Sequence, residues 1–389
     1  MSLKQYDIAI CGAGPAGLAA ALALHRGGDK VTIFDQFDRP RPIGSGLILQ
    51  PTGLAVLDWL GLGDKIRGYG KRIDRLYGKA GNRVVLDVRY AALGELRGLA
   101  VHRAGLFKVL HDGLVAADLN VTTSSKIRSL DGKHLILDDG RSVGPFDIVI
   151  DGLGSRSPLI QYASGPDYRR SMPYGAIWAS LPWPGEAFDG HALEQRYYRA
   201  SKMSGVLPIG SYDATSGDQA AFFWSLKTAD YAAWKADGLQ RWKDDVLALW
   251  PETAQLLDSI SSQDQMTMAS YDHHTLSLPY GANIVFIGDS AHSTSPQLGQ
   301  GANMALLDVF ALTNALATAV DAQSAFASYA QTRRRHVQIY QAMSLIFTPF
   351  YQSDSRVYPF LRDNLVATVS KFSPIQKLLA NIVAGHVGR

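Results

Sequence analysis

The chain has 389 residues, 47% hydrophobic and 19% charged, which is enough to bury the cores of two domains and excludes a disordered protein. Its net charge of +3 is too small to indicate a nucleic-acid partner, and a single cysteine, Cys11, excludes an internal disulfide and favours a reducing cytoplasm. Neither a signal peptide nor the roughly 18 apolar residues of a membrane span is found, so we predict a cytoplasmic protein without stable membrane insertion.

The first forty residues follow a strand, turn, helix and strand plan. An apolar strand is predicted over Tyr6 to Cys11, a helix continues to His25, and a second strand runs from Val31 to Phe34 and ends at Asp35. The turn between the first strand and the helix reads G-x-G-x-x-G, as in dinucleotide-binding folds. It comprises Gly12, Ala13, Gly14, Pro15, Ala16 and Gly17. We therefore predict that this glycine turn and the helix N-terminus hold a pyrophosphate, and that Asp35 accepts from ribose hydroxyls.

A Pro-rich loop follows, and its arginines have two open interpretations. Arg39 and Arg41 lie either beside phosphates or a flavin edge, or they are ordinary solvated loop residues. After the loop we predict a strand over 47–49, a helix over 52–60, a hairpin that turns near Gly81, and a helix entered through His102 and Arg103.

Another carboxylate follows a buried strand later in the chain. The strand predicted over Phe146 to Ile150 ends in Asp151 and Gly152, and such a pair at a strand's carboxyl end indicates a ligand crevice. From about 174 to 271 the segments alternate and are rich in aromatic residues, which predicts an antiparallel sheet with a helical stretch over 231–251. A sheet inserted there is suited to covering an apolar pocket.

The segment GDSAHSTSPQLGQGAN, from Gly288 to Asn303, lies between an apolar strand and a long helical pattern. Asp289 is its isolated carboxylate and is expected to end the apolar strand, and STSPQLGQGAN contains no ionisable group. These residues predict an uncharged, glycine-rich bend that leads into a helix.

Together the three motifs resemble the class A flavoprotein monooxygenases, the relatives of para-hydroxybenzoate hydroxylase. The motifs are GAGPAG, DG at Asp151 and Gly152, and GDSAHSTSPQLGQGAN, and they span most of the chain. The resemblance implies an α/β protein with a Rossmann-like (GR2-type) FAD-binding domain, an inserted antiparallel-sheet substrate domain and a C-terminal helical region. The FAD-binding domain would comprise 1–72, 98–173 and 272–330, the substrate domain 73–97 and 174–271, and the C-terminal region 331–389.

The resemblance also implies a site and a reaction. Bound FAD would contact the glycine turn, Asp35, Arg41, Arg103, Asp151 and Gly152, with Asp289 on the ribityl chain and Gly301, Ala302 and Asn303 at the pyrimidine edge. Pro296 and Gly299 would lie against the flavin ring, where oxygen reacts. The implied activity is hydroxylation of a small aromatic or unsaturated substrate with O2 and NADH or NADPH, through a flavin C4a-hydroperoxide, by a monomer or homodimer. No general base is assigned.

One position departs from the family pattern D-G-x-x-S-x-x-R. Pro158 stands where the arginine is expected, and Arg156 precedes it by two residues. This leaves two expectations open: Arg156 substitutes in handling the nicotinamide, or a separate flavin reductase supplies reduced flavin.

Other interpretations are weaker. A hydrolase lacks its G-x-S-x-G elbow, and the adjacent His273 and His274 form a hydrogen-bonding pair more often than a metal site, so no metal is predicted. A reductase or dehydrogenase of the same fold and a non-enzymatic escort protein remain as alternatives. The RRRH run from Arg333 to His336 is expected to be a solvated helix face, and the apolar C-terminal region to pack on the FAD domain or close the pocket.

Overall fold

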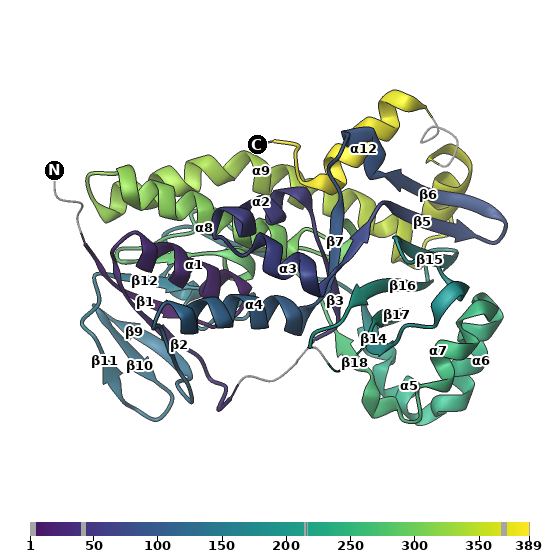
Figure 1. Cartoon of the computed structure of the whole chain (residues 1–389), viewed down its shortest axis with the longest axis horizontal. Coiled ribbons are helices and arrows are strands. Elements are labelled where there is room, and N and C mark those ends of the chain that lie inside the picture. Colours follow the sequence, from purple (N-terminus) through teal and green to yellow (C-terminus); the bar gives the residue numbers. More distant parts are fainter. Residues whose placement is uncertain (1–4, 40–43, 214, 216, 367–371, 389) are drawn as a thin grey trace.

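The computed structural model describes residues 5–39, 44–213, 215, 217–366 and 372–388 (Figure 1). Its α-helices run over Pro15–Arg26 (α1), Pro51–Trp59 (α2), Gly63–Tyr69 (α3), Arg103–Ala116 (α4), Tyr231–Asp237 (α5), Leu239–Leu249 (α6), Ala254–Asp258 (α7), Gly301–Thr318 (α8), Ala322–Tyr351 (α9), Val357–Leu361 (α10) and Ser373–Ala384 (α12). Arg362–Val366 forms one π-helical turn. Among the described residues, no helix is both long and apolar enough to cross a membrane.

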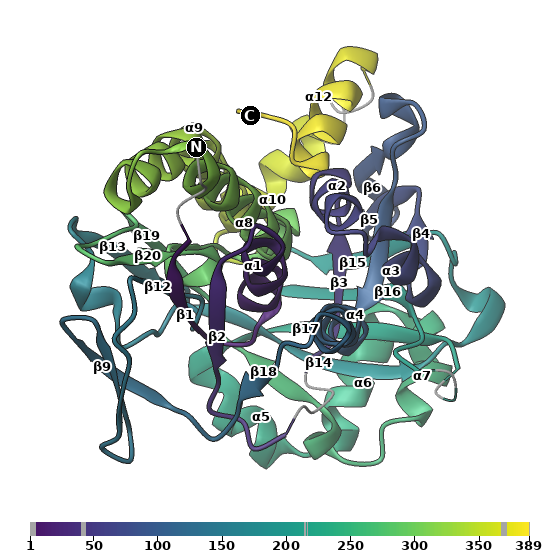
Figure 2. The same cartoon turned by 60° about the vertical axis from the view of Figure 1, so that its left-hand side comes forward.

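A five-stranded parallel sheet forms the centre of the first lobe. Its order is β20-β12-β1-β2-β8, with β1 at Asp7–Cys11, β2 at Lys30–Phe34, β8 at Val121–Thr122, β12 at Ile148–Asp151 and β20 at Ile284–Phe286. Strand β1 is apolar on both faces because both are covered. Ile8 and Ile10 pack into a core shared with α1, α4 and α8, while Ala9 and Cys11 pack against a small antiparallel sheet. That sheet contains β9 (Ile127–Asp131), β10 (His134–Leu137) and β11 (Ser142–Val143), seen beside β1 in Figure 2.

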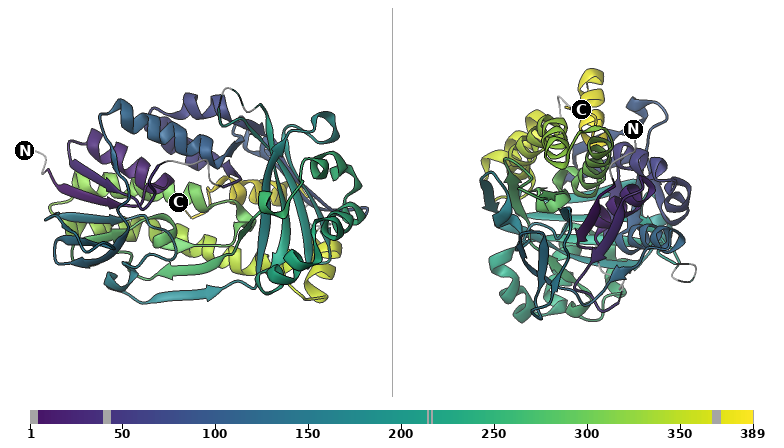
Figure 3. Two further views of the ribbon diagram at one scale, coloured as in Figure 1. Left: turned by 90° about the horizontal axis from the view of Figure 1, so that it is seen from below. Right: turned by 90° about the vertical axis from the view of Figure 1, so that its left-hand side faces the viewer.

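A seven-stranded sheet forms the second lobe. Its order is β18-β14-β17-β16-β15-β5-β6, with β5 at Arg75–Ala80, β6 at Arg83–Arg89, β14 at Tyr174–Pro182, β15 at Ala192–Tyr198, β16 at Lys202–Gly210, β17 at Gln219–Lys227 and β18 at Thr267–Ala269. All seven strands fall within 73–97 and 174–271. Trp234, Trp242 and Trp250 pack α5 to α7 onto the outer face, so these tryptophans form core. Figure 3 shows this helical segment on the side of the sheet that faces away from the first lobe. The opposite face turns toward the first lobe.

Two three-stranded antiparallel sheets connect the lobes. One contains β3 (Gly46–Leu49), β7 (Gly98–His102) and β4 (Lys71–Ile73), and the other contains β13 (Asp167–Ser171), β19 (Asp272–Leu276) and β21 (His292–Ser293).

The structure differs from three sequence expectations. The single helical stretch expected over 231–251 is broken at Gly238, whose φ of 85° ends α5 and begins α6. Helix α9 runs through 330–331, so the expected domain boundary there cuts a helix, and it continues past Pro349. Asp289 does not end a strand, because β20 stops at Phe286 and Asp289 lies in the 3₁₀ turn Gly288–Ser290.

Candidate active site

A cavity of about 1680 Å³ lies between the two lobes. This exceeds the roughly 300–1,000 Å³ of a typical single-ligand pocket, so the cavity has room for two ligands side by side. One end is lined by the glycine turn, Asp35 and Arg103, and the other by the inner face of the seven-stranded sheet. The segment from Thr294 to Ala302 lies on the wall that joins these ends.

The glycine turn has the tight backbone that a pyrophosphate site needs. Gly12 has a φ of 98°, and a Cβ there would lie 2.7 Å from the carbonyl oxygen of Gly152. A Cβ on Gly17 would lie 1.9 Å from the oxygen of Gly12, whereas one on Gly14 would meet nothing within 4 Å. No side chain caps the N-terminus of α1, so its free N–H groups are available to an anion. This backbone fits the predicted pyrophosphate contact.

Asp35 lies at the end of β2 and lines the cavity. Its two carboxylate oxygens accept from the backbone N–H groups of Ala13 (2.6 Å) and Phe37 (3.1 Å). The carboxylate therefore fixes the glycine turn to β2, and each oxygen retains lone pairs for a ribose hydroxyl.

Arg103 and Asp289 both line the cavity and carry opposite charges. Arg103 begins α4 and packs closely on Gly44. A Cβ added to Gly44 would lie 2.7 Å from Cδ of Arg103. Asp289 is open to the cavity, and no side chain or backbone N–H of the described residues donates a hydrogen bond to it. Enclosure in the protein raises its pKa, against the opposing effects of His292 and Arg103. The free carboxylate fits a ligand hydroxyl. Arg41 lies outside the described residues.

The uncharged bend is shaped by a left-handed glycine and a buried amide. Pro296 is exposed to the cavity, and Gly299 has a φ of 60° at the end of the turn Pro296–Leu298. Gly301 and Ala302 line the cavity at the uncapped start of α8. The Asn303 side chain faces away from the cavity and is fully buried. It accepts from the N–H of Gln50 (2.8 Å) and donates to the carbonyls of Ile48 (3.0 Å) and Gly299 (2.9 Å), so it fastens the bend to β3.

The structure separates the two residues of the DG motif. Gly152 lines the cavity, but the Asp151 side chain is fully buried and accepts from Ser157 and from the N–H of Leu153 (2.8 Å). Burial raises the pKa of Asp151 to about 7, against these two hydrogen bonds. Its carboxylate therefore shapes the loop rather than facing a ligand.

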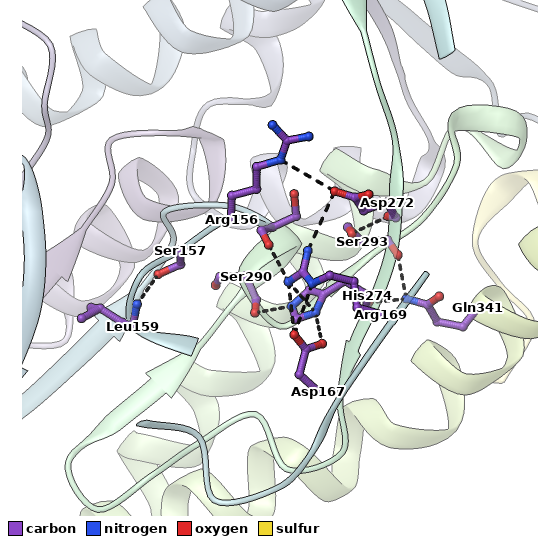
Figure 4. Close-up of polar contacts among 11 residues, drawn as sticks. Arg156, Ser157, Leu159, Asp167, Arg169, Asp272, His274, Ser290, Ser293 and Gln341 are labelled. Atoms are coloured by element: carbon purple, nitrogen blue, oxygen red, sulfur yellow. Dashed lines mark hydrogen bonds and ion pairs between the residues drawn. The ribbon is translucent and has the colours of Figure 1, made fainter. Parts of the chain in front are cut away.

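Two arginines meet beside this loop (Figure 4). Arg156 lines the cavity edge, and its Nε lies 3.7 Å from an Asp272 oxygen. Arg169, on β13, donates to the carbonyl of Ser155 (2.7 Å) and lies 3.9 Å from the same Asp272 oxygen. No local sequence pattern indicates Arg169, because the register of β13 against β19 decides its position.

A buried charge network lies behind the bend, and the sequence pattern did not predict it. Asp308, on α8, accepts from His292 Nε2 (2.7 Å), from Arg333 Nε (2.7 Å) and from the N–H of Gly288 (2.8 Å). Burial alone would raise its pKa, but His292 and Arg333 outweigh burial and lower the pKa to about 2. The expectation that the RRRH run is a solvated face is therefore wrong for Arg333 and His336, which are buried, while Arg334 and Arg335 are exposed.

The free energy of unfolding is expected to fall as the pH falls, because the folded protein disfavours protonation of His336. Burial and the Arg333 charge lower its pKa to about 4, against about 6.5 in an unfolded chain. As pH falls from 6.5 toward 4, only the unfolded chain takes up this proton, so folding loses about 2–3 kcal/mol. Urea unfolding of wild type and His336→Gln at pH 7 and 4.5 measures this, with the variant showing the smaller loss. Equal losses in both proteins would contradict the assignment.

His273 and His274 form hydrogen bonds in the structure. His273 Nδ1 pairs with Gln341 Oε1 (3.0 Å), and His274 Nε2 donates to the carbonyl of Ser290 (2.9 Å). Among the described parts of the chain, no group of three or more His, Cys, Asp or Glu side chains is placed to hold a metal ion.

A nucleotide-binding lobe whose cavity continues beneath a second, mainly antiparallel sheet fits an FAD-dependent oxidoreductase. The family model described as "FAD binding domain" matches residues 5–130 and 187–343, and the chain belongs to this family, within the class A flavoprotein monooxygenases. This cofactor fits the uncapped start of α1, Asp35, and Asp289, which accepts no hydrogen bond from the described residues.

Relatives cover most of the chain. Phenazine 1,6-dicarboxylic acid hydroxylase PhzS of Lysobacter antibioticus is 28% identical over 360 residues, covering 85% of this chain and 87% of the relative. Aurachin C monooxygenase/isomerase of Stigmatella aurantiaca is 23% identical over 381 residues, covering 93% and 94%. The structure of Klebsiella pneumoniae HpxO complexed with FAD and uric acid matches with a TM-score of 0.82 at 19% identity, covering 97% of each chain, which shows the shared fold.

Proposed function

We propose that the protein is an FAD-dependent monooxygenase that hydroxylates a small aromatic or unsaturated molecule, with O2 and NADH or NADPH as co-substrates. One observation carries this proposal: a single cavity runs from the glycine turn and Asp289, past the Pro296 bend, to an aromatic face of the second lobe. The names of the relatives, which include hydroxylases and monooxygenases, support the same reaction class.

The residues have distinct roles in this proposal. The backbone of the glycine turn binds the pyrophosphate, Asp35 the adenosine ribose and Asp289 a ribityl hydroxyl, while Arg103 offsets the phosphate charge. The start of α8 at Gly301 and Ala302 lines the cavity, where its positive end would stabilise negative charge on a bound flavin. When bound, FAD supplies the redox chemistry that activates O2 for transfer of one oxygen atom.

The chain contributes a dry chamber for this transfer. The bend from Ser293 to Asn303 has no ionisable side chain, and the sheet contributes Trp178, Leu193 and Phe223 to the same cavity. Ser295 is held by the hydroxyls of Ser344 (3.0 Å) and Thr348 (2.6 Å) on α9, so the bend is fixed rather than open. Such an environment protects a reactive oxygen species from protons and water.

Arg156, together with Arg169, takes the place of the missing motif arginine in our proposal. Both guanidinium groups lie at the Asp272 edge of the DG loop, where they can attract an anionic nicotinamide cofactor. A separate flavin reductase is the alternative. The division into an FAD-binding domain, a substrate domain and a C-terminal region, a cytoplasmic location and a monomeric or homodimeric state also stay proposals.

Purified protein should be yellow and should oxidise NADH or NADPH faster when an aromatic substrate is present. The assay screens candidate aromatics while hydrogen peroxide release and product formation are measured in parallel. Stimulated oxidation with less than matching peroxide supports hydroxylation. Stimulation with fully matching peroxide and no oxygenated product from any aromatic would contradict the proposed reaction.

Asp289→Ala is expected to weaken FAD binding by about 10- to 100-fold, because a charged hydrogen-bond acceptor for the cofactor is lost. The ratio of flavin to protein absorbance after gel filtration measures FAD retention. Asp112→Ala, which removes an exposed carboxylate paired with Lys108, serves as the control and should retain FAD. Full flavin occupancy of Asp289→Ala would refute the ribityl contact.

A further inference from the structure

We infer that the substrate is an uncharged, largely apolar aromatic molecule that carries an oxygen atom held by the hydroxyl of Tyr271. This inference rests on the proposed monooxygenase function and specifies its substrate class. It is carried by the distribution of charge, aromatic rings and hydrogen-bond donors within the cavity.

Charge is confined to one end of the cavity. Among the described residues that line it, the Asp, Glu, Lys and Arg side chains all belong to the first lobe: Asp35, Arg103, Lys126, Arg128, Asp138, Arg156 and Asp289. The described lining residues of the seven-stranded sheet, α9 and α12 are all uncharged. Among the described residues, no lining cation of this end is placed to pair with a bound carboxylate or phosphate. Such a group would lose its hydration without compensation, which disfavours an anionic substrate.

Aromatic rings from the seven-stranded sheet and α9 line this end of the cavity. Trp178 and Phe223 lie 4.6 Å apart between ring centroids, and Tyr197 and Tyr351 lie 5.3 Å apart. Leu193, on β15, lies on the same side. Such a surface favours a planar apolar molecule through burial and offset stacking.

The cation behind these rings has hydrogen-bond partners for two of its three side-chain nitrogens. Arg362 is fully buried 4.8 Å from the Tyr197 ring centroid, where Nε donates to Asp363 (2.7 Å) and Nη1 to the carbonyl of Phe350 (2.9 Å). Arg362 does not line the cavity. Its Nη2 has no hydrogen-bond partner among the described residues, but the Tyr197 and Tyr351 rings lie against the guanidinium. A direct comparison of neutral and anionic probes tests whether this charge reaches a ligand in the cavity.

Tyr271 supplies a polar contact on the aromatic side. Its hydroxyl oxygen accepts from Trp178 Nε1 (3.1 Å), which leaves the hydroxyl hydrogen free to donate into the cavity. Burial raises the pKa of Tyr271 to about 12, against the Trp178 hydrogen bond, so the phenol stays protonated near neutral pH. A neutral carbonyl or hydroxyl oxygen on the substrate fits this donor.

Equilibrium binding to the FAD-loaded protein at pH 7.5 tests the substrate class without turnover. The probes are naphthalene, 2-naphthol and 6-hydroxy-2-naphthoate, followed by equilibrium dialysis and by changes in the flavin absorption bands. We expect 2-naphthol to bind at least tenfold more tightly than the naphthoate. Equal or tighter binding of the naphthoate would overturn the inference.

Substitutions of Leu193 and Tyr271 test which residues determine the preference for a neutral probe and the contact with its oxygen atom. Leu193→Arg should shift the preference toward the naphthoate by at least tenfold, whereas Tyr198→Arg, exposed on the same strand, should leave it unchanged. Tyr271→Phe should weaken 2-naphthol binding about two- to tenfold while leaving naphthalene binding unchanged. No shift with Leu193→Arg, or equal loss of both probes with Tyr271→Phe, would contradict the assignment.

Product analysis separates this inference from the proposed function. Hydroxylation of the naphthoate but not of 2-naphthol would overturn the substrate class and leave the monooxygenase function standing. Neutral preference in the binding assay supports the substrate class whether or not these probes are turned over.

Discussion

Asp308→Ala is expected to lower the free energy of unfolding by about 3–5 kcal/mol, because removing one partner of a buried ion pair leaves the other charge uncompensated. Asp308 and Arg333 are both buried, and the carboxylate also holds His292 and the N–H of Gly288. Urea denaturation at pH 7, followed by circular dichroism, measures the loss.

A double variant separates the charge effect from a simple loss of packing. Asp308→Ala combined with Arg333→Met removes both charges, so it should be more stable than Asp308→Ala alone. The exposed pair of Lys108 and Asp112 gives the comparison, since Asp112→Ala should change stability by less than about 1 kcal/mol. A double variant less stable than Asp308→Ala would contradict the uncompensated-charge explanation.

The same substitution should affect the cofactor site. Asp308 fixes the N–H of Gly288, whose φ of 61° sets the turn that presents Asp289 to the cavity. Loss of that hydrogen bond should loosen the turn and reduce FAD retention in protein that is still folded. The buried network therefore connects the stability of α8 and α9 to the position of a carboxylate at the active site.

The local sequence pattern was sufficient to predict the elements that depend on residues close together in the chain. The first strand, the glycine turn, α1 and β2 follow from the period of apolar residues and from glycine positions in the first forty residues. The hairpin of β5 and β6 turns at Gly81, where it was expected, because its φ of 55° favours glycine. The antiparallel sheet within 174–271 follows likewise from alternation and aromatic content.

Features that depend on tertiary contacts were not predictable from local pattern. Arg333 and Arg334 are adjacent in a basic run, yet one is buried and the other exposed, because only Arg333 meets Asp308 on a neighbouring helix. Asp151 looks like Asp35 in sequence, since both follow apolar strands. However, Ser157 folds back onto the Asp151 carboxylate and removes it from the cavity. Partner positions far apart in the chain decide these outcomes.

Gly12→Ala is expected to destabilise the protein by about 3 kcal/mol or more and to abolish FAD retention. The φ of 98° at Gly12 is unfavourable for a residue with a Cβ, and that Cβ would lie 2.7 Å from the oxygen of Gly152. Relief of the contact requires the glycine turn and the DG loop to move apart, and both line the cavity. Thermal unfolding and flavin absorbance of the purified variant measure the two effects.

Gly14→Ala is the matched control, since Gly14 lies two residues away in the same turn. Its φ of −72° suits alanine, and an added Cβ would meet nothing within 4 Å. We expect this variant to fold with near wild-type stability but to bind FAD more weakly, because the methyl group enters space that the pyrophosphate would occupy. Normal FAD affinity in Gly14→Ala would place the pyrophosphate elsewhere. Normal stability of Gly12→Ala would instead mean that the DG loop can move away from residue 12 with little loss of free energy. The close contact with Gly152 would then not fix the glycine turn.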